Sequence, residues 1–216
     1  NFAEAGGFIK SGPEEAIPDL QVHLVVGKMV DHGRKTEVGH GYSCHVCLLR
    51  PRSRGSLRLG NADPHSAPLI DPAFLQDPDD VSRLVRGFKL MRRIMQQPAL
   101  AQHGAVEFPA VAAAQSDAQI EQYIRNNADT VYHPVGSCRM GAGALDVVDH
   151  ELRVHGMQGL RVVDASIMPR VVSGNTNAPT IMIGEKAAEL IKAAARPQSI
   201  KADAGVASSQ HETVGT

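Results

Sequence analysis

Hydrophobic and polar residues alternate along the first part of the chain. The segment 20–26 (LQVHLVV) has this pattern, and shorter runs of the same kind occur at 44–48 and 57–59. Successive side chains of a β-strand point to opposite faces, so a period of two indicates strands that bury one face. We predict that the three runs form one antiparallel sheet, with turns at the glycine-containing segments 31–34 and 52–55.

Two helices are predicted after the strands. The first starts with Asp77 as the N-cap and Pro78 at the first helical position, and its apolar residues recur at helical spacing to about Gln97. The second starts at Ser116, where Gln119 completes a capping box. Strands and helices together predict an α+β fold, an antiparallel sheet backed by helices, with the methionines of the first helix in the core.

The composition changes near residue 129. Beyond it, glycine, proline and short β-prone runs dominate until a helix that is predicted from about Pro179 to Ala195. We therefore expect a substrate-binding part over residues 1–128 and a loop-rich segment over 129–195. A flexible tail of small and polar residues is expected over 196–216.

Composition and charge exclude several classes of function. With 43% hydrophobic residues, the 216-residue chain can bury a core, and its net charge of −1 offers no basic surface for nucleic acid. No apolar run reaches the ~18 residues that span a bilayer, and no secretory signal opens the chain. We expect a protein that is cytoplasmic, or peripheral to the inner membrane.

The cysteines do not indicate a disulfide framework or a metal site. There are three, Cys44, Cys47 and Cys138, which favours a reducing compartment. The first two form a C-x-x-C motif, but residues three apart in a strand point to opposite faces. Because no second ligand pair follows at zinc-site spacing, we interpret both as small residues of the sheet.

Three segments in the second half of the chain contain the candidate catalytic and cofactor-binding residues. They are residues 132–141 (YHPVGSCRMG), 159–169 (GLRVVDASIMP) and 175–180 (NTNAPT). In this order they resemble the C-terminal part of the glucose-methanol-choline (GMC) oxidoreductases, a family that uses FAD to oxidise alcohols. The resemblance extends over roughly residues 1–195.

The resemblance implies a protein larger than this chain. Family members begin with a strand, a G-x-G-x-x-G turn and a helix that bind the ADP half of FAD, and these 216 residues lack that Rossmann part. The chain, which starts at Asn1, is thus expected to be a C-terminal fragment whose partner is the N-terminal FAD-binding half. Residues 1–128 would form a roof over the flavin, and 129–195 would complete the FAD-binding domain.

Alcohol oxidation needs a hydride acceptor and a base. A cofactor must accept the hydride, whereas a histidine can accept the hydroxyl proton near pH 7. Among the 10 histidines, His133 precedes Pro134, which restrains its backbone, and Gly136 follows. With the resemblance, we predict that His133 is the catalytic base. His155 stands at a turn before a glycine and is interpreted as a surface residue.

Asn177 is the predicted second catalytic residue, because the family uses either His or Asn in that role. Its amide would donate a hydrogen bond to the substrate oxygen without titrating. The alternative is an N-cap of the following helix, since Asn before Ala178 and Pro179 is a good helix start. Asn175 and Thr176 offer other polar caps nearby, which favours the catalytic role.

The resemblance also implies contacts to FAD. Asp164 and Ala165 would pass along the ribityl and pyrophosphate side, where a small alanine lets the backbone come close. The alternative for Asp164 is a turn or capping aspartate, because a carboxylate beside phosphate is costly. Tyr132, Pro179 and Thr180 are further flavin-contact candidates, with plain packing as the alternative.

The motifs resemble bacterial dehydrogenases of primary alcohols more than choline dehydrogenases. We therefore expect oxidation of a primary aliphatic or aromatic alcohol to the aldehyde, with electrons passed to a quinone-type acceptor. One alternative is choline dehydrogenase-like activity. Another is a non-catalytic interaction module, because the cofactor-binding half is missing and a fold alone does not fix a function.

Overall fold

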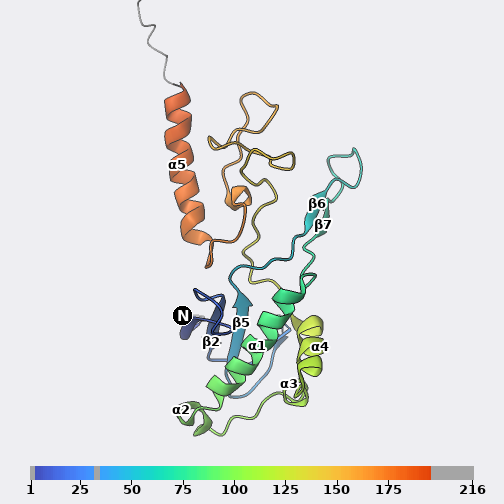
Figure 1. Ribbon diagram of the computed structural model, residues 1–216, viewed down its shortest axis with the longest axis vertical. Coiled ribbons are helices and arrows are strands. Elements are labelled where there is room, and N and C mark those ends of the chain that lie inside the picture. Colours follow the sequence, from blue (N-terminus) through green and yellow to red (C-terminus); the bar gives the residue numbers. More distant parts are fainter. Residues whose placement is uncertain (1–2, 32–34, 196–216) are drawn as a thin grey trace, which may run out of the picture.

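A three-stranded sheet crossed by one long helix forms the lower part of the molecule, and a loop-rich segment with a second long helix lies above it (Figure 1). The computed structural model describes residues 3–31 and 35–195. The strands are β1 (Ala5–Ile9), β2 (Leu20–Val25), β3 (Met29–Val30), β4 (Lys35–Thr36), β5 (Ser43–Leu48), β6 (Ser56–Arg58) and β7 (Leu69–Asp71). The helices are α1 (Pro78–Met95), α2 (Pro98–Ala101), α3 (Pro109–Ala113), α4 (Asp117–Asn127), the short 3-10 helix η2 (Ala165–Ile167) and α5 (Asn177–Ala195).

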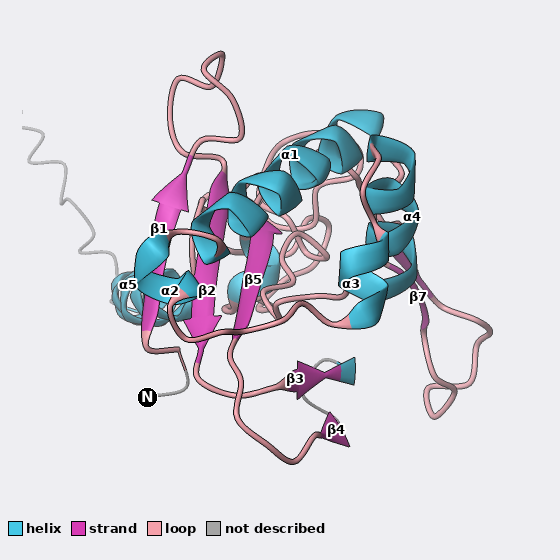
Figure 2. Ribbon diagram, turned by 90° about the horizontal axis from the view of Figure 1, so that it is seen from below, coloured by secondary structure: helices cyan, strands magenta, loops and turns pink. Residues whose placement is uncertain are grey.

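The main sheet has the order β1-β2-β5, and both outer strands run antiparallel to β2. Helix α1 lies across one face of it (Figure 2). At the crossing, a Cβ on Gly87 would come within 2.9 Å of Leu20 Cδ1 and 3.2 Å of Val46 Cγ2. Glycine therefore lets the helix lie close to the sheet. Because side chains alternate along a strand, Gln21 and His23 point to the opposite face.

The third predicted strand does not join this sheet. Residues 56–58 form β6, which pairs with β7 in a separate two-stranded sheet. The prediction of one sheet for all three runs was wrong, because a period of two identifies a strand without identifying its partner. The third strand of the main sheet is β1 instead, whose sequence AGGFI has no clear alternation.

Both predicted helices are confirmed together with their caps. The Asp77 side chain accepts a hydrogen bond from the Asp79 N–H, and α1 ends two residues before the predicted Gln97. At α4, Ser116 and Gln119 form the capping box in both directions. The two helices pack through a shared buried cluster, Val81, Val85, Ala114, Ile120 and Ile124.

A buried charge cluster ties α1 to the ends of β2 and β5. The carboxylate of Asp80, a residue 1% exposed, accepts hydrogen bonds from the Arg52 N–H and from the N–H and hydroxyl of Ser53. Arg83 Nη2 lies 2.9 Å from the same carboxylate and Nη1 lies 3.9 Å from Asp19. Burial alone would raise the pKa of Asp80, but these hydrogen bonds and the Arg83 charge outweigh it and lower the pKa.

The C-terminal segment has a core of its own. Its buried residues are Val148, Leu152, Ile167, Met168, Ile183 and Ala187. Helix α5 supplies the last two and begins at Asn177, two residues before the predicted start. The predicted tail at 196–216 lies outside the described residues. Helices backing an antiparallel sheet, with a loop-rich C-terminal segment, confirm the predicted α+β class.

Candidate active site

The three motif segments of the sequence meet in the structure. The N–H groups of Gly136 and Cys138 both donate to the Ser166 carbonyl, at 3.0 and 3.1 Å. Gly136 can make this turn because its φ of 89° lies in a region that favours glycine. The loop that carries His133 is therefore pinned to η2, and the segment before α5 reaches the same histidine.

His133 is held at both ring nitrogens. Asn175 Nδ2 lies 2.9 Å from Nε2, and Thr176 Oγ1 lies 3.0 Å from Nδ1. An amide nitrogen can only donate, so Nε2 accepts, and the proton of a neutral ring is left on Nδ1, where it faces Thr176. His133 thus has an unprotonated Nε2, which is what a general base requires.

The residue that contacts His133 in the structure is Asn175, and the catalytic role predicted for Asn177 stays a prediction. Asn177 is exposed and is the first residue of α5. The N-cap of α5 is Thr176 and not Asn177. The carbonyl of buried Thr176 accepts the first helical bond, from the Thr180 N–H at 3.0 Å. Asn175, which the sequence pattern offers only as a cap, makes the contact.

Tyr132 has an unusual backbone conformation next to the histidine. Its φ is 63°, its side chain is 65% exposed, and its N–H donates to the Thr130 hydroxyl at 2.9 Å. For a residue other than glycine such a conformation costs on the order of 1–3 kcal/mol, and such residues cluster at functional sites. The surrounding contacts therefore hold Tyr132 in a conformation that it would rarely adopt on its own.

The predicted cofactor contacts lie on η2 and on the first turn of α5. Asp164 caps η2 by accepting from the Ser166 N–H at 2.7 Å, as the capping alternative expects, and Ala165 follows, half-buried. Ser166 Oγ is buried and has no hydrogen-bond partner within the described part of the chain. Pro179 and Thr180 are half-buried, and the Thr180 hydroxyl donates to a backbone carbonyl of its own turn at 2.6 Å.

The face of the main sheet opposite α1 carries polar residues near His133 that were not predicted as part of the site. Gln21 Nε2 donates to Asn175 Oδ1 at 3.1 Å, and His23, two residues further along β2, pairs in register with His45 of β5. Burial and the charge of nearby His133 lower the pKa of His23, which keeps its ring neutral near pH 7. The polar phase of the alternation at 20–26 was the signal for Gln21 and His23.

A second hydrogen bond joins the sheet to the loop of Asn175. Arg50 Nη1 donates to Ser173 Oγ at 2.9 Å and to the Pro18 carbonyl at 3.1 Å. Ser173 has a φ of 64°, so the chain bends sharply there before it reaches Asn175. Arg50 and Gln21 therefore fix this loop from the side of the sheet.

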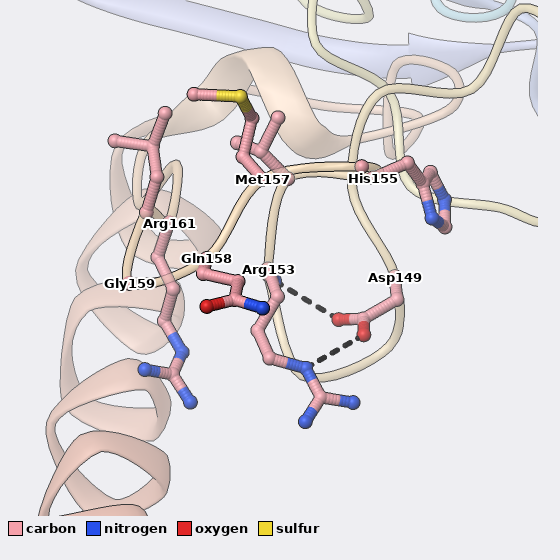
Figure 3. Close-up of a pocket in the computed structure, with 10 residues that line it drawn as sticks. Asp149, Arg153, His155, Met157, Gln158, Gly159 and Arg161 are labelled. Carbon is pink, nitrogen blue, oxygen red and sulfur yellow. Dashed lines mark hydrogen bonds and ion pairs between the residues drawn. The ribbon is translucent and has the colours of Figure 1, made fainter.

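A separate cleft of about 420 Å³ lies among the loops at 149–161 (Figure 3). Its charges neutralise one another, because Arg153 Nε lies 2.8 Å from Asp149 and Nη1 lies 2.6 Å from Glu151. Burial alone would raise the pKa of Asp149, but hydrogen bonds from Arg153 and the Glu151 N–H, with the Arg153 charge, lower it to about 2. His155 is exposed, as predicted. His133 does not line this cleft, so we do not assign the cleft to the active site.

The structure agrees with the interpretation of the C-x-x-C motif. Cys44 pairs in register with Leu24 and Cys47 with Gln21, so the two thiols point to opposite faces, and burial raises the pKa of each. Within residues 3–31 and 35–195, no group of three or more His, Cys, Asp or Glu could hold a metal ion. No helix in those ranges is long and apolar enough to cross a membrane.

Comparison with known proteins connects this geometry to a family. Residues 51–184 match the family model for the C-terminal domain of GMC oxidoreductases. The chain is 51% identical over 191 residues to an alcohol dehydrogenase (acceptor) of Pseudomonas putida, covering 88% of this chain and 35% of that protein. It is 44% identical over 192 residues to an oxygen-dependent choline dehydrogenase of Escherichia coli, covering 89% and 34%. The chain thus spans about a third of the length of these relatives.

Solved structures with the same fold are also oxidoreductases. Pyridoxine 4-oxidase from Mesorbium loti superimposes with a TM-score of 0.77 at 29% identity, over 89% of this chain and 38% of that one. A formate oxidase variant from Aspergillus oryzae, studied for its FAD modification, gives a TM-score of 0.73 at 26% identity, over 83% and 32%.

Proposed function

The chain belongs to the GMC oxidoreductase family, and from that membership we propose that it is the C-terminal part of an FAD-dependent enzyme that oxidises a primary alcohol to the aldehyde. The observation that carries the proposal is the contact of His133 Nε2 with the Asn175 amide, at 2.9 Å. The 51% identity to an alcohol dehydrogenase supports the substrate class. The partner in this proposal is the N-terminal FAD-binding half of the same enzyme.

When bound, FAD would accept the hydride that leaves the carbinol carbon. The residues proposed to hold it are Asp164, Ala165, Tyr132 and the first turn of α5. Two features fit such a group: the unpartnered buried Ser166 Oγ, and the N-terminus of the 19-residue α5, whose unpaired N–H groups and positive dipole end suit an electron-rich ring. The first turn contains no acidic residue.

The proton chemistry follows from the side chains in place. We infer that the substrate hydroxyl displaces the direct contact of Asn175 Nδ2 with His133 Nε2, now 2.9 Å long, and hydrogen-bonds to both groups. Its O–H bond breaks and the proton goes to Nε2, while the amide donates to the oxygen as negative charge develops. Thr176 accepts from Nδ1–H and so holds the ring in place. Asn177, exposed like Asn175 and the first residue of α5, stays the alternative donor of this hydrogen bond.

The electron acceptor is proposed to be quinone-type. The alcohol dehydrogenase relative is named for an acceptor, whereas the choline dehydrogenase relative is named oxygen-dependent. Choline dehydrogenase-like activity is the second candidate function, and the 44% identity to that relative favours it. A non-catalytic module is the third possibility, and it predicts no flavin reduction by any alcohol.

The test is anaerobic stopped-flow reduction of the full-length flavoprotein by aliphatic primary alcohols, benzyl alcohol and choline. In His133→Ala, flavin reduction should slow by about 10²–10⁴, the usual contribution of a positioned base, while FAD stays bound. His150→Ala is the matched control, since His150 is an exposed histidine of the same segment. A His133→Ala enzyme that keeps wild-type speed would refute the assignment of the base, and a wild-type protein that no alcohol reduces would refute the proposed function.

A further inference from the structure

We propose that Gln21, on the central strand of the sheet, is a positioning residue that fixes which nitrogen of His133 is free to take a proton. It acts through one intermediate side chain. Gln21 Nε2 donates to Asn175 Oδ1 at 3.1 Å, and Asn175 Nδ2 lies 2.9 Å from His133 Nε2. The inference rests on the proposed function in one respect, the use of His133 as a base.

The argument begins with the two ends of the Asn175 amide. One end only accepts hydrogen bonds and the other only donates them, so the orientation of the amide follows from its partners. Gln21 presents an N–H donor, and a donor can be met only by Oδ1. The opposite end, Nδ2, must then face His133, where it requires an acceptor.

The histidine has one way to satisfy that requirement. Nε2 must be unprotonated, so the ring proton of neutral His133 lies on Nδ1. The Thr176 hydroxyl, 3.0 Å from Nδ1, can accept that proton, although a hydroxyl can equally donate and so does not choose between the tautomers. The choice is made on the Asn175 side, and there the structure places the Gln21 Nε2 donor against Oδ1.

The backbone of Gln21 is held firmly in the sheet. It lies in the middle strand, paired in register with Phe8 of β1 on one side and Cys47 of β5 on the other. Its backbone therefore cannot move without breaking the sheet on both sides. The Asn175 loop, in contrast, has no secondary structure of its own and begins at the strained Ser173.

Gln21→Glu replaces the hydrogen-bond donor that faces Asn175 with an acceptor, with almost no change in the shape of the side chain. A carboxylate cannot donate, so it repels Oδ1 and attracts Nδ2, and the Asn175 amide rotates by half a turn. Oδ1 then faces His133 Nε2, which must become protonated to donate to it, and the free nitrogen moves to the Thr176 side. A histidine held in the wrong tautomer loses most of its value as a base.

The primary readout is the protonation of His133 itself, because it does not depend on turnover. Full-length enzyme labelled with ¹⁵N-histidine is compared as wild type, Gln21→Glu and the neutral variant Gln21→Met, and the His133 signals are assigned from their loss in His133→Gln. We expect an unprotonated Nε2 in the wild type, a protonated Nε2 in Gln21→Glu, and a mixture in Gln21→Met. An unchanged tautomer in folded Gln21→Glu overturns the proposal.

The second readout is flavin reduction by alcohol, with a matched control. Gln122 Nε2 donates to Asn126 Oδ1 at 3.0 Å on the exposed surface of α4, so Gln122→Glu makes the same chemical change to the same kind of bond away from the site. Gln21→Glu should slow reduction at least about tenfold, towards the 10²–10⁴ that a positioned base supplies. Gln122→Glu should leave the rate within about twofold.

A double-mutant cycle separates this route from a general disturbance of the sheet. In an Asn175→Ala background there is no amide to rotate, so adding Gln21→Glu should change neither the tautomer nor the rate further. An undiminished effect of Gln21→Glu in that background overturns the proposal. If wild-type enzyme shows the expected tautomer but no alcohol reduces it, the proposed function fails while the positioning role of Gln21 stands.

Discussion

Removing the buried carboxylate of Asp80 should destabilise the main sheet and its helices more than any exposed charge change in the chain. Asn at this position has nearly the same shape, but its amide N–H₂ would face the N–H groups of Arg52 and Ser53, which also donate. Arg83, whose side chain is 5% exposed, would lose its nearest buried partner. Breaking a buried pair in this way costs about 3–5 kcal/mol, a large share of the ~5–15 kcal/mol that stabilises a typical domain.

Urea unfolding of the full-length protein, followed by circular dichroism, measures this loss in Asp80→Asn. Asp117→Asn is the control, because Asp117 forms an ion pair with Lys89 at 73% side-chain exposure and should cost no more than about 1 kcal/mol. The lowered pKa of Asp80 also makes its effect depend on pH. Its contribution to the free energy of unfolding is complete above the unfolded pKa of 3.8 and is lost as the pH falls below that value. In Asp80→Asn, the free energy of unfolding should therefore fall less steeply at acid pH than in the wild type. A loss equal to that of Asp117→Asn would refute the reasoning.

Two further predictions concern the flavin. Thr180→Asp in the full-length protein should lower the flavin reduction potential and slow flavin reduction, because a carboxylate at the start of α5 opposes the helix dipole where the reduced ring gains negative charge. Thr180→Asn is the uncharged control. An unchanged potential in folded, FAD-loaded Thr180→Asp would mean that α5 does not face the flavin. The isolated 216-residue chain should not retain FAD through purification, because it contains no G-x-G-x-x-G turn to bind the pyrophosphate; a stoichiometric flavin absorbance would contradict this.

Local signals predicted the elements well. Asp77 and Ser116 each cap a helix because a cap depends on neighbours a few residues away, and the alternation at 20–26 found the central strand for the same reason. Which strand pairs with which, in contrast, could not be predicted from neighbouring residues. The strand at 56–58 pairs with β7, and the position beside the Leu20 strand is taken by β1.

The same limit applies to the active site. Motif order singled out His133 as the candidate base, but three consecutive polar residues stand at the start of α5 and all suit a helix start: Asn175, Thr176 and Asn177. Which of them reaches the histidine depends on the bend at Ser173, whose side chain is bonded to the distant Arg50. The alternation at 20–26 places Gln21 on the polar face of its strand, but its contact with Asn175 could not be predicted, because that partner is 154 residues away.

The bond between Gln21 and Asn175 also has a consequence for the order of events during synthesis. It joins residues 154 positions apart, and ribosomes add ~5–20 residues per second, so the two partners emerge about 8–30 s apart. Contacts over such separations form late in folding, because a long loop must close first. A nascent chain can therefore complete the sheet and even contain His133 while its base is still unoriented. The proton acceptance proposed for His133 can therefore begin only after the loop of Asn175 has folded back onto β2.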